Sequence, residues 1–313
     1  MVDPGQASGA EERGSRDSAS DADRARGALL GAAIGDALGQ PLEGHRAPGQ
    51  RDIEIAMSHE RDLRWTDDTA LTIAFAESLV EVGGLDEDQL ALAFARTWRA
   101  EPWRGYGPRA AALFESVADG GSWHELARTT RSWGNGAAMR VAPAAVFAAG
   151  NITRTLDLAR RSALVTHTHP LAVDGAVVQA FAVASALRPG AAGALAVSRR
   201  MQEQLDRVDS MPVAATPDDV ALEIGHGVDA LSSVPAARAV VRLAGGSMET
   251  TMRFALALGG DTDTIASMAG AVVGARLGAG AIPKAWLDRL EGLGRLIRLA
   301  DKLVAANGHG VSP

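Results

Sequence analysis

Hydrophobic residues recur at three- and four-residue steps along most of the chain, the spacing that places them on one face of an α-helix. Two such series are Leu71, Phe75, Leu79 and Val82, and, after Pro283, Trp286, Leu290, Leu293 and Ile297. Similar patterns predict helices over residues 26–38, 87–99, 108–118, 137–149, 154–164, 171–187, 190–207, 217–230, 234–244, 248–258 and 263–278. Alternating apolar and polar runs of strand length are absent, and residues 213–215 are too few to build a sheet. The pattern therefore predicts an all-α fold, a compact many-helix bundle in a single domain.

The two ends of the chain lack this helical pattern. Residues 1–23 are rich in Gly, Ser, Ala, Asp, Glu and Arg without periodicity, which predicts a disordered tail, and residues 307–313 are predicted to form a flexible tail. No linker or fixed-period repeat divides residues 24–306, which we expect to form one domain. Segment 188–247 carries ordinary charged helices, so we expect it to decorate the fold rather than to carry chemistry.

Composition narrows the classes of function. Of the 313 residues, 47% are apolar and 4% aromatic, and small side chains predict helices that pack closely. The net charge of −7 argues against a general nucleic-acid or membrane-surface binder, although a local basic patch stays open. The absence of cysteine excludes disulfides, thiolate nucleophiles and cysteine-ligated zinc. Because no signal segment or uninterrupted membrane-length apolar stretch is visible, we expect a soluble, cytoplasmic protein, with a monomer favoured.

The first candidate motif, Thr66-Asp67-Asp68-Thr69, directly precedes a predicted apolar helix. Hydroxyls and carboxylates at a helix start accept hydrogen bonds from free N–H groups, and acids suit the positive end of the helix dipole. Taken alone, the motif is better explained as a helix cap than as a metal site.

The second motif, Gly259-Gly260-Asp261-Thr262-Asp263-Thr264, also precedes a predicted helix and changes this interpretation. A cap needs one acceptor, whereas the two motifs together supply four carboxylates and several hydroxyls. These hard oxygen ligands suit Mg²⁺ or Mn²⁺, and four carboxylates can hold two metals about 4 Å apart. If the motifs converge, they predict a binuclear metal site at helix N-termini, because four acidic groups without cations would repel one another.

Five ordered blocks resemble the ADP-ribosylglycohydrolases, the family of dinitrogenase reductase-activating glycohydrolase and of the type 1 and type 3 ADP-ribosylhydrolases. The blocks are residues 27–39 with Glu43 following, Trp65–Thr69, Gly105-Tyr106-Gly107, residues 132–140 and Gly259–Thr264, and Thr166-His167 lies between the last two. One block is a modest signal, whereas five in this order are specific. The resemblance covers about residues 26–278 and implies an all-α fold with two Mg²⁺ or Mn²⁺ ions at the bottom of a cleft.

The resemblance also implies roles for the residues that match the family's motifs. The implied metal ligands are Thr66, Asp67, Asp68, Asp261, Asp263 and Thr264. Glu43 matches a mobile glutamate that contributes to catalysis in some members, and the expected catalytic residues are Glu43, Asp67 and Asp261. The expected substrate-binding residues, around the pyrophosphate and adenosine half of ADP-ribose, are Gly105, Tyr106, Gly107, Ser132, Trp133, Gly134, Asn135, Gly136 and His167.

The residue types in these loops fit such roles to different degrees. Glycines let backbone N–H groups approach phosphates, and Trp133 offers a flat face for adenine, with Gly-Asn-Gly neighbours that favour a loop over a core position. For Tyr106, a substrate contact and an ordinary turn residue are equally open. The His-Thr-His run starting at His167 is better explained as a loop before Pro170, with His167 facing the cleft, than as a zinc site. Asp36 either supports the site from behind or ends a helix.

The resemblance implies a hydrolase that cleaves ADP-ribose from an acceptor at ribose C1″, through an oxocarbenium-like transition state and with two divalent cations. Its partner would be ADP-ribose or an ADP-ribosylated substrate, with no membrane and with nucleic acid only as a modified substrate. A hydrolase of O-acetyl-ADP-ribose or a related nucleotide is one alternative, and a non-catalytic ADP-ribose-binding module is another. The acceptor (arginine, serine, a nucleic-acid base or an acetyl group) and the choice between Mg²⁺ and Mn²⁺ stay open.

Overall fold

The computed structural model describes residues 19–307 apart from residue 59. Within these residues sixteen α-helices and two short 3₁₀ helices follow one another, and the only extended pairings are two isolated bridges, Leu63 with Leu290 and Gly134 with Asp229. The predicted all-α class is therefore confirmed. The elements are α1 (Asp21–Gly39), η1 (Gln40–Leu42), α2 (Gln50–Ala56), α3 (Asp67–Val82), α4 (Glu87–Ala100), α5 (Pro108–Ala118), α6 (Trp123–Thr130), α7 (Ala142–Phe147), α8 (Ile152–Leu164), α9 (Pro170–Leu187), α10 (Arg199–Ser210), α11 (Pro217–Glu223), α12 (Ala230–Ala244), α13 (Met248–Leu258), α14 (Thr262–Leu277), η2 (Ala279–Ala281), α15 (Lys284–Leu287) and α16 (Leu293–Asn307).

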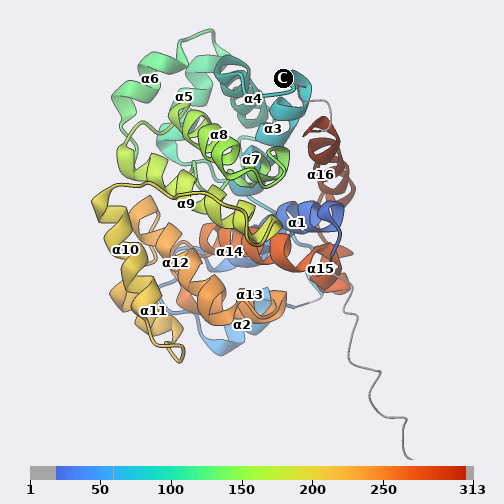
Figure 1. The fold of residues 1–313 in the computed structure, drawn as a ribbon, viewed down its shortest axis with the longest axis vertical. Coiled ribbons are helices and arrows are strands. Elements are labelled where there is room, and N and C mark those ends of the chain that lie inside the picture. The colour runs from blue at the N-terminus through green and yellow to red at the C-terminus, as the bar shows by residue number, and fades with distance from the viewer. Residues whose placement is uncertain (1–18, 59, 308–313) are drawn as a thin grey trace, which may run out of the picture.

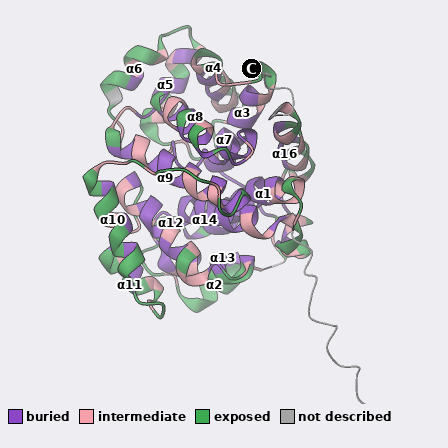
Figure 2. Ribbon diagram, viewed as in Figure 1, coloured by how far each residue is buried: buried purple, intermediate pink, exposed green. Residues whose placement is uncertain are grey.

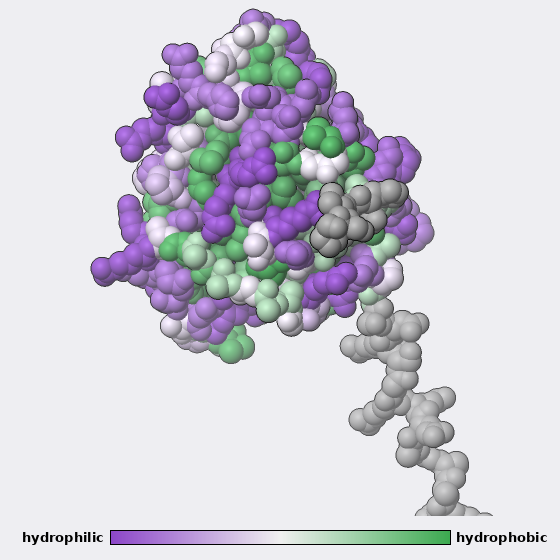
Figure 3. Space-filling model, turned by 45° about the horizontal axis from the view of Figure 1, so that its top comes forward, coloured by the Kyte–Doolittle hydropathy of each residue, from purple (hydrophilic) through white to green (hydrophobic). Residues whose placement is uncertain are grey.

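Helices α1 and α14 form the centre of the molecule. Figure 1 shows α3 to α8 gathered on one side of this pair and α2 and α10 to α13 on the other. The two central helices are buried along almost their whole length, while the outer helices expose one face (Figure 2). On the face shown in Figure 3, hydrophilic side chains surround smaller apolar patches, as expected where helices bury only one stripe.

Glycines bring the backbones of α1 and α14 into direct contact. A Cβ atom added at Gly31 would lie 2.2 Å from the carbonyl oxygen of Gly270, and one at Gly274 would lie 1.9 Å from that of Gly27. Only hydrogen fits at these positions, which recur every four residues and so share one helix face. At the end of this face, a Cβ at Gly39 would lie 2.5 Å from the Cα of Asp263. The contact therefore fixes the start of α14 against the end of α1.

The predicted N-terminal boundary differs from the observed one. Residues 1–18, most of the predicted tail, lie outside the described residues, as do 308–313 of the predicted C-terminal tail. The predicted tail of residues 1–23 is wrong for its last three residues, because α1 already begins at Asp21. The hydroxyl of Ser20 accepts a hydrogen bond from the N–H of Asp23 and caps the helix.

Several internal boundaries also differ from prediction. The helix predicted over 190–207 begins only at Arg199, where Ser198 caps it, and that predicted over 217–230 ends at Glu223, just before Gly225 at φ +92°. The series from Trp286 to Ile297 divides into α15 and α16 around Gly292, at φ +69°. Helices α2 and α6 were not predicted, because they are only 7 and 8 residues long.

Helix α9 is long and apolar enough to cross a membrane by composition alone. In this structure it is a core helix, since 67% of its 18 residues are buried inside the protein. Its burial against α7, α8, α12 and α14 explains its apolar composition.

Candidate active site

The two Asp motifs meet although they lie far apart in the sequence. Thr66 caps α3, with Asp67 and Asp68 in the first turn, and Asp261 precedes α14, with Asp263 and Thr264 in its first turn. The Thr264 hydroxyl donates a hydrogen bond of 3.3 Å to Oδ2 of Asp68, across 196 residues of sequence. The convergence that the sequence left as an inference is therefore present in the structure.

Capping accounts for only part of this oxygen cluster. The Thr66 hydroxyl accepts from the N–H of Asp68, as a cap does, but the Asp261 side chain makes no cap hydrogen bond. Oδ1 of Asp68 is buried without a hydrogen-bond partner among the described residues. A buried carboxylate oxygen with no donor is costly, so it implies a ligand that supplies positive charge.

Glu43 joins the cluster from the loop after η1. Glu43, Asp261 and Asp263 each place one carboxylate oxygen within 4.8 Å of the others. Burial, followed by repulsion from Asp261, raises the pKa of Glu43 above its usual range. Hard oxygen donors with this separation fit Mg²⁺ or Mn²⁺.

The carboxylates destabilise one another when no cation is bound. Burial and then the charge of Asp36 raise the pKa of Asp67 to about 8. Burial also raises the pKa of Asp68 and of Asp263 well above the usual range, and neighbouring carboxylates add to both shifts. Divalent cations would remove this repulsion, and the donor set therefore fits the predicted metal centre.

Asp36 supports the first motif from behind. Its carboxylate is fully buried and accepts hydrogen bonds from the N–H and hydroxyl of Thr66 (2.9 Å each to Oδ1) and of Thr69 (3.0 and 2.6 Å to Oδ2). Burial raises its pKa to about 6, against the effect of these four donors. The Thr66 proton points at Asp36 and one lone pair of its oxygen accepts from the N–H of Asp68, so the second lone pair is left to face a cation.

A cleft of about 450 Å³ opens over this cluster. Its lining includes the predicted residues Glu43, Thr66, Asp67, Asp68, Gly105, Gly107, Ser132, Trp133, Gly134, Asn135, Gly136, His167, Asp261, Asp263 and Thr264. Arg109, Met139, Arg140, Val228 and Asp229 also line it and were not predicted. Tyr106 is the one predicted site residue that the structure does not bring into the lining: its ring packs edge-on against Phe114, with centroids 6.0 Å apart, and its hydroxyl is buried.

Asn135 connects three parts of the cleft. Its side-chain amide donates to a carboxylate oxygen of Asp261 and to the Ser233 hydroxyl (3.1 Å), and its backbone N–H donates to the carbonyl of Val228 (3.0 Å). The backbone N–H of Asp261 in turn donates to the carbonyl of His226. The loop between α11 and α12 thus contacts both the Asn135 loop and the Asp261 motif.

This loop corrects the expectation that segment 188–247 only decorates the fold. Val228 and Asp229 face the cleft, and the negative charge of Asp229 raises the pKa of Asp261, after burial as the larger cause. One signal for this loop is visible in the sequence: the Gly225-His226-Gly227 turn before a helix start resembles the Gly-rich turns of the other site loops.

His167 is buried beside Thr166 and Arg140. Arg140 donates to the Thr166 hydroxyl at 2.7 Å, and this hydroxyl is hydrogen-bonded to Nδ1 of His167, also at 2.7 Å. Nε2 of His167 lies toward Gly134 and Gly136. Burial, and then the nearby Arg140 charge, lowers the pKa of His167 to about 3. His167 is therefore a neutral imidazole at this wall of the cleft.

Trp133 lies at the mouth of the cleft and not in the core. Its side chain is 49% exposed, and its ring centroid lies 6.0 Å from that of His169. An exposed indole above glycine-rich backbone offers a stacking face for a planar ring.

Comparison with known proteins shows which family this chain belongs to. A model of the ADP-ribosylglycohydrolase family matches residues 17–311. The chain is 31% identical to ADP-ribosylhydrolase ARH3 of Xenopus tropicalis, over 86% of this chain and 91% of that protein, and 30% identical to ARH3 of Homo sapiens, over 90% and 92%. A solved structure, an ADP-ribosylglycohydrolase-related protein complex, superposes with a TM-score of 0.71 at 29% identity and covers 92% of this chain and 99% of its own.

Proposed function

Because the chain belongs to the ADP-ribosylglycohydrolase family, and is a hydrolase of that family, we propose that it releases ADP-ribose from an acceptor with the help of two divalent cations. The observation that carries the metal requirement is the hydrogen-bonded convergence of Asp68 and Thr264, with an unpartnered carboxylate oxygen beside them. The names of the ARH3 relatives support the bond that is cleaved.

We propose that the cations lie between the two helix starts. Thr66, Asp67 and Asp68 would hold them from α3, and Asp261, Asp263 and Thr264 from α14. Bound cations supply charge that polarises ribose hydroxyls and a water. The positive ends of α3 and α14 alone do not neutralise this many carboxylates.

The chain's own groups would manage the proton. Glu43 reaches the cluster from a loop, is exposed and has a raised pKa, so it is placed to exchange a proton between the cluster and solvent. A carboxylate so placed can take the proton of the attacking water as the water oxygen bonds to C1″ and the bond from C1″ to the acceptor breaks. The same proton can then pass to the acceptor atom that leaves. Asp67 and Asp261 would stabilise the positive charge that develops on the ribose ring.

The remaining lining would bind the rest of ADP-ribose. The glycines on either side of Asn135 would let the backbone of this loop approach phosphate oxygens closely, and the His167 ring packs against the same glycines. Trp133 would stack on the adenine. The Arg109 and Arg140 side chains, which also line the cleft, add positive charge toward a pyrophosphate.

A direct test strips the protein with a chelator and then assays ADP-ribose release with Mg²⁺ or Mn²⁺ restored. Substrates carry ADP-ribose on serine, on arginine or as O-acetyl-ADP-ribose. We expect activity to require a divalent cation and to fall at least about a thousandfold in the Asp261→Ala/Asp263→Ala variant, since removal of groups that stabilise developing charge has effects of this size.

The control is Asp218→Ala, which removes an exposed carboxylate on α11 that does not line the cleft. Activity retained after chelation, or in the double variant, would overturn the binuclear mechanism. Binding of ADP-ribose without turnover of any substrate would favour a binding module instead.

A further inference from the structure

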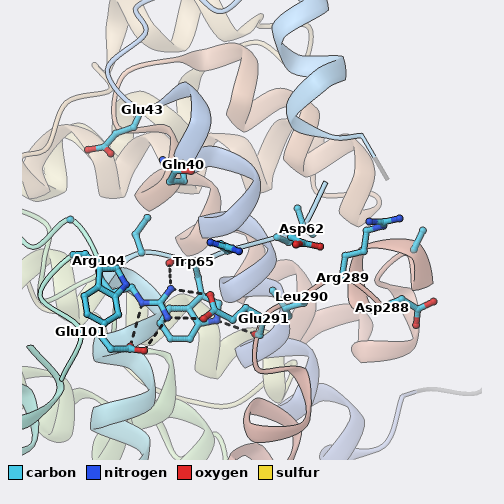
Figure 4. Close-up of a pocket in the computed structure, with 16 residues that line it drawn as sticks. Gln40, Glu43, Asp62, Trp65, Glu101, Arg104, Asp288, Arg289, Leu290 and Glu291 are labelled. Atoms are coloured by element: carbon cyan, nitrogen blue, oxygen red, sulfur yellow. Dashed lines mark hydrogen bonds and ion pairs between the residues drawn. The ribbon is translucent and has the colours of Figure 1, made fainter. Parts of the chain in front are cut away.

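A groove of about 1090 Å³ joins the cleft at the metal cluster. Glu43, Thr66 and Gly105 line both cavities, so the two meet where the two carboxylate motifs converge. In Figure 4, Glu43 lies at one end of the groove lining, and Asp288 and Arg289 lie at the other. The groove therefore leads from the reacting bond away from the ADP-ribose half.

One wall of the groove is a rigid ion-pair network. The Arg104 guanidinium lies 3.7 Å over the Trp65 ring, makes two bonds to Glu291 (2.7 and 2.9 Å) and bonds to Glu101 (Figure 4). It also donates to the backbone carbonyl of Trp65, and the carbonyl of Arg104 accepts from the N–H of Asp67. This hydrogen bond connects the wall of the groove directly to the motif that begins at Thr66.

The groove surface carries both signs of charge and one exposed aromatic ring. Trp103 is 71% exposed, and Asp62 and Arg64 are also exposed. The structure records no ion pair between Arg64 and any described residue. Exposed Trp and Arg side chains in a concave surface are the types that dominate binding energy at protein interfaces.

The volume and the charge of the groove together indicate which kind of molecule binds in it. The groove is more than twice as large as the cleft, which is far more than an acetyl group or one amino-acid side chain needs. Apart from Glu43, the groove lining holds four acidic side chains, Asp62, Glu101, Asp288 and Glu291, against three arginines, Arg64, Arg104 and Arg289. This excess of negative charge would repel the phosphates of a polynucleotide. We infer that this groove binds the polypeptide segment that flanks the modified residue, with Trp103 and Arg64 as its specificity-determining contacts. This inference rests on the proposed hydrolase function.

The test compares a peptide substrate with a single-amino-acid substrate that carries the same ADP-ribose linkage. The pair is prepared once with a serine linkage and once with an arginine linkage. One is an ADP-ribosylated peptide of about a dozen residues, long enough to follow a groove, and the other is the same ADP-ribosylated amino acid alone. In Trp103→Ala and Arg64→Ala we expect kcat/KM for the peptide to fall about tenfold through KM. The value for the single amino acid should stay within about twofold of wild type.

Matched controls are Leu222→Ala and Arg207→Ala, which remove exposed side chains from α11 and α10, outside both cavities. An equal fall in kcat/KM for both substrates would show that Trp103 is only structural and would overturn the inference. An unchanged kcat/KM for the peptide in these variants would overturn it as well. An ADP-ribosylated oligonucleotide cleaved faster than the peptide would also overturn it. Failure of the wild type to cleave any substrate would instead overturn the proposed function.

Discussion

The Thr66 hydroxyl lies between Asp36, which supports the site from behind, and the carboxylates that we propose to bind the cations. Thr66 and Thr69 each give Asp36 one backbone and one side-chain hydrogen bond. Only Thr66 also lines the cleft, whereas Thr69 is buried behind it. The two residues therefore form a matched pair in which one oxygen faces the proposed cations and the other does not.

We expect Thr66→Val to weaken Mn²⁺ binding about tenfold more than Thr69→Val. Both variants should lower the free energy of unfolding of the metal-free protein by about 1–3 kcal/mol, because each leaves a donor to buried Asp36 missing. Titration calorimetry with Mn²⁺ and thermal unfolding measure the two effects separately. Equal losses of affinity would remove Thr66 from the ligand set.

The local sequence predicted the roles of some site residues but not of others. The cap at Thr66 and the paired carboxylates were predicted because helix starts are encoded by adjacent residues. Asp36 could not be assigned, since its four donors come from residues 30 and 33 positions away. The place of the Tyr106 ring depends on Phe114, which belongs to the helix that follows, and no pattern around the Gly-Tyr-Gly turn indicated it.

At the scale of elements, the contact between α1 and α14 sets the geometry of the site. The glycine faces leave no gap between the two backbones, so the start of α14 cannot shift along α1 without a clash. Periodicity predicted both helices, but it could not predict that they pair, because both are apolar on all sides.

We expect Gly31→Ala to destabilise the protein by about 3 kcal/mol or more. The added Cβ would lie 2.2 Å from a backbone oxygen that no rotamer change can move, so overpacking exceeds the helix propensity gained. Urea unfolding measures the loss, and Gly280→Ala in η2, with nothing within 4 Å, is the control. A Gly31→Ala variant as stable as wild type would contradict the close contact.

At the scale of the whole molecule, the buried carboxylates link stability to pH. The pKa of Asp67 is raised to about 8 and that of Asp36 to about 6, whereas both carboxyls titrate near 4 when unfolded. Groups shifted upward contribute stability that is fully present below the unfolded pKa and is lost as pH rises through the folded pKa. The lowered pKa of His167 acts in the opposite direction, but only up to about pH 6.5, where the unfolded histidine loses its proton. The metal-free protein should therefore lose stability as pH rises toward 8, most clearly above about pH 6.5.

Calorimetric scans across this pH range check the slope. We expect the Tm of the metal-free protein to fall by a few degrees as pH rises, and saturating Mn²⁺ to remove most of that fall, because cations favour the charged carboxylates. A metal-free Tm that rises from about pH 6.5 to pH 8 would contradict the clustering of the four aspartates.

The pairing of the first described helix with one near the C-terminus has a consequence for synthesis on the ribosome. Helix α1 is made first, yet the glycine face it presents has no partner until α14 leaves the exit tunnel. Domains generally fold as units during translation, and this domain cannot form its central helix pair until most of the chain has been synthesised. A nascent chain halted before residue 259 would carry only the α3 half of the proposed metal site and an unpaired α1, so we expect it to depend on chaperones and to hold no cation until α14 has been made.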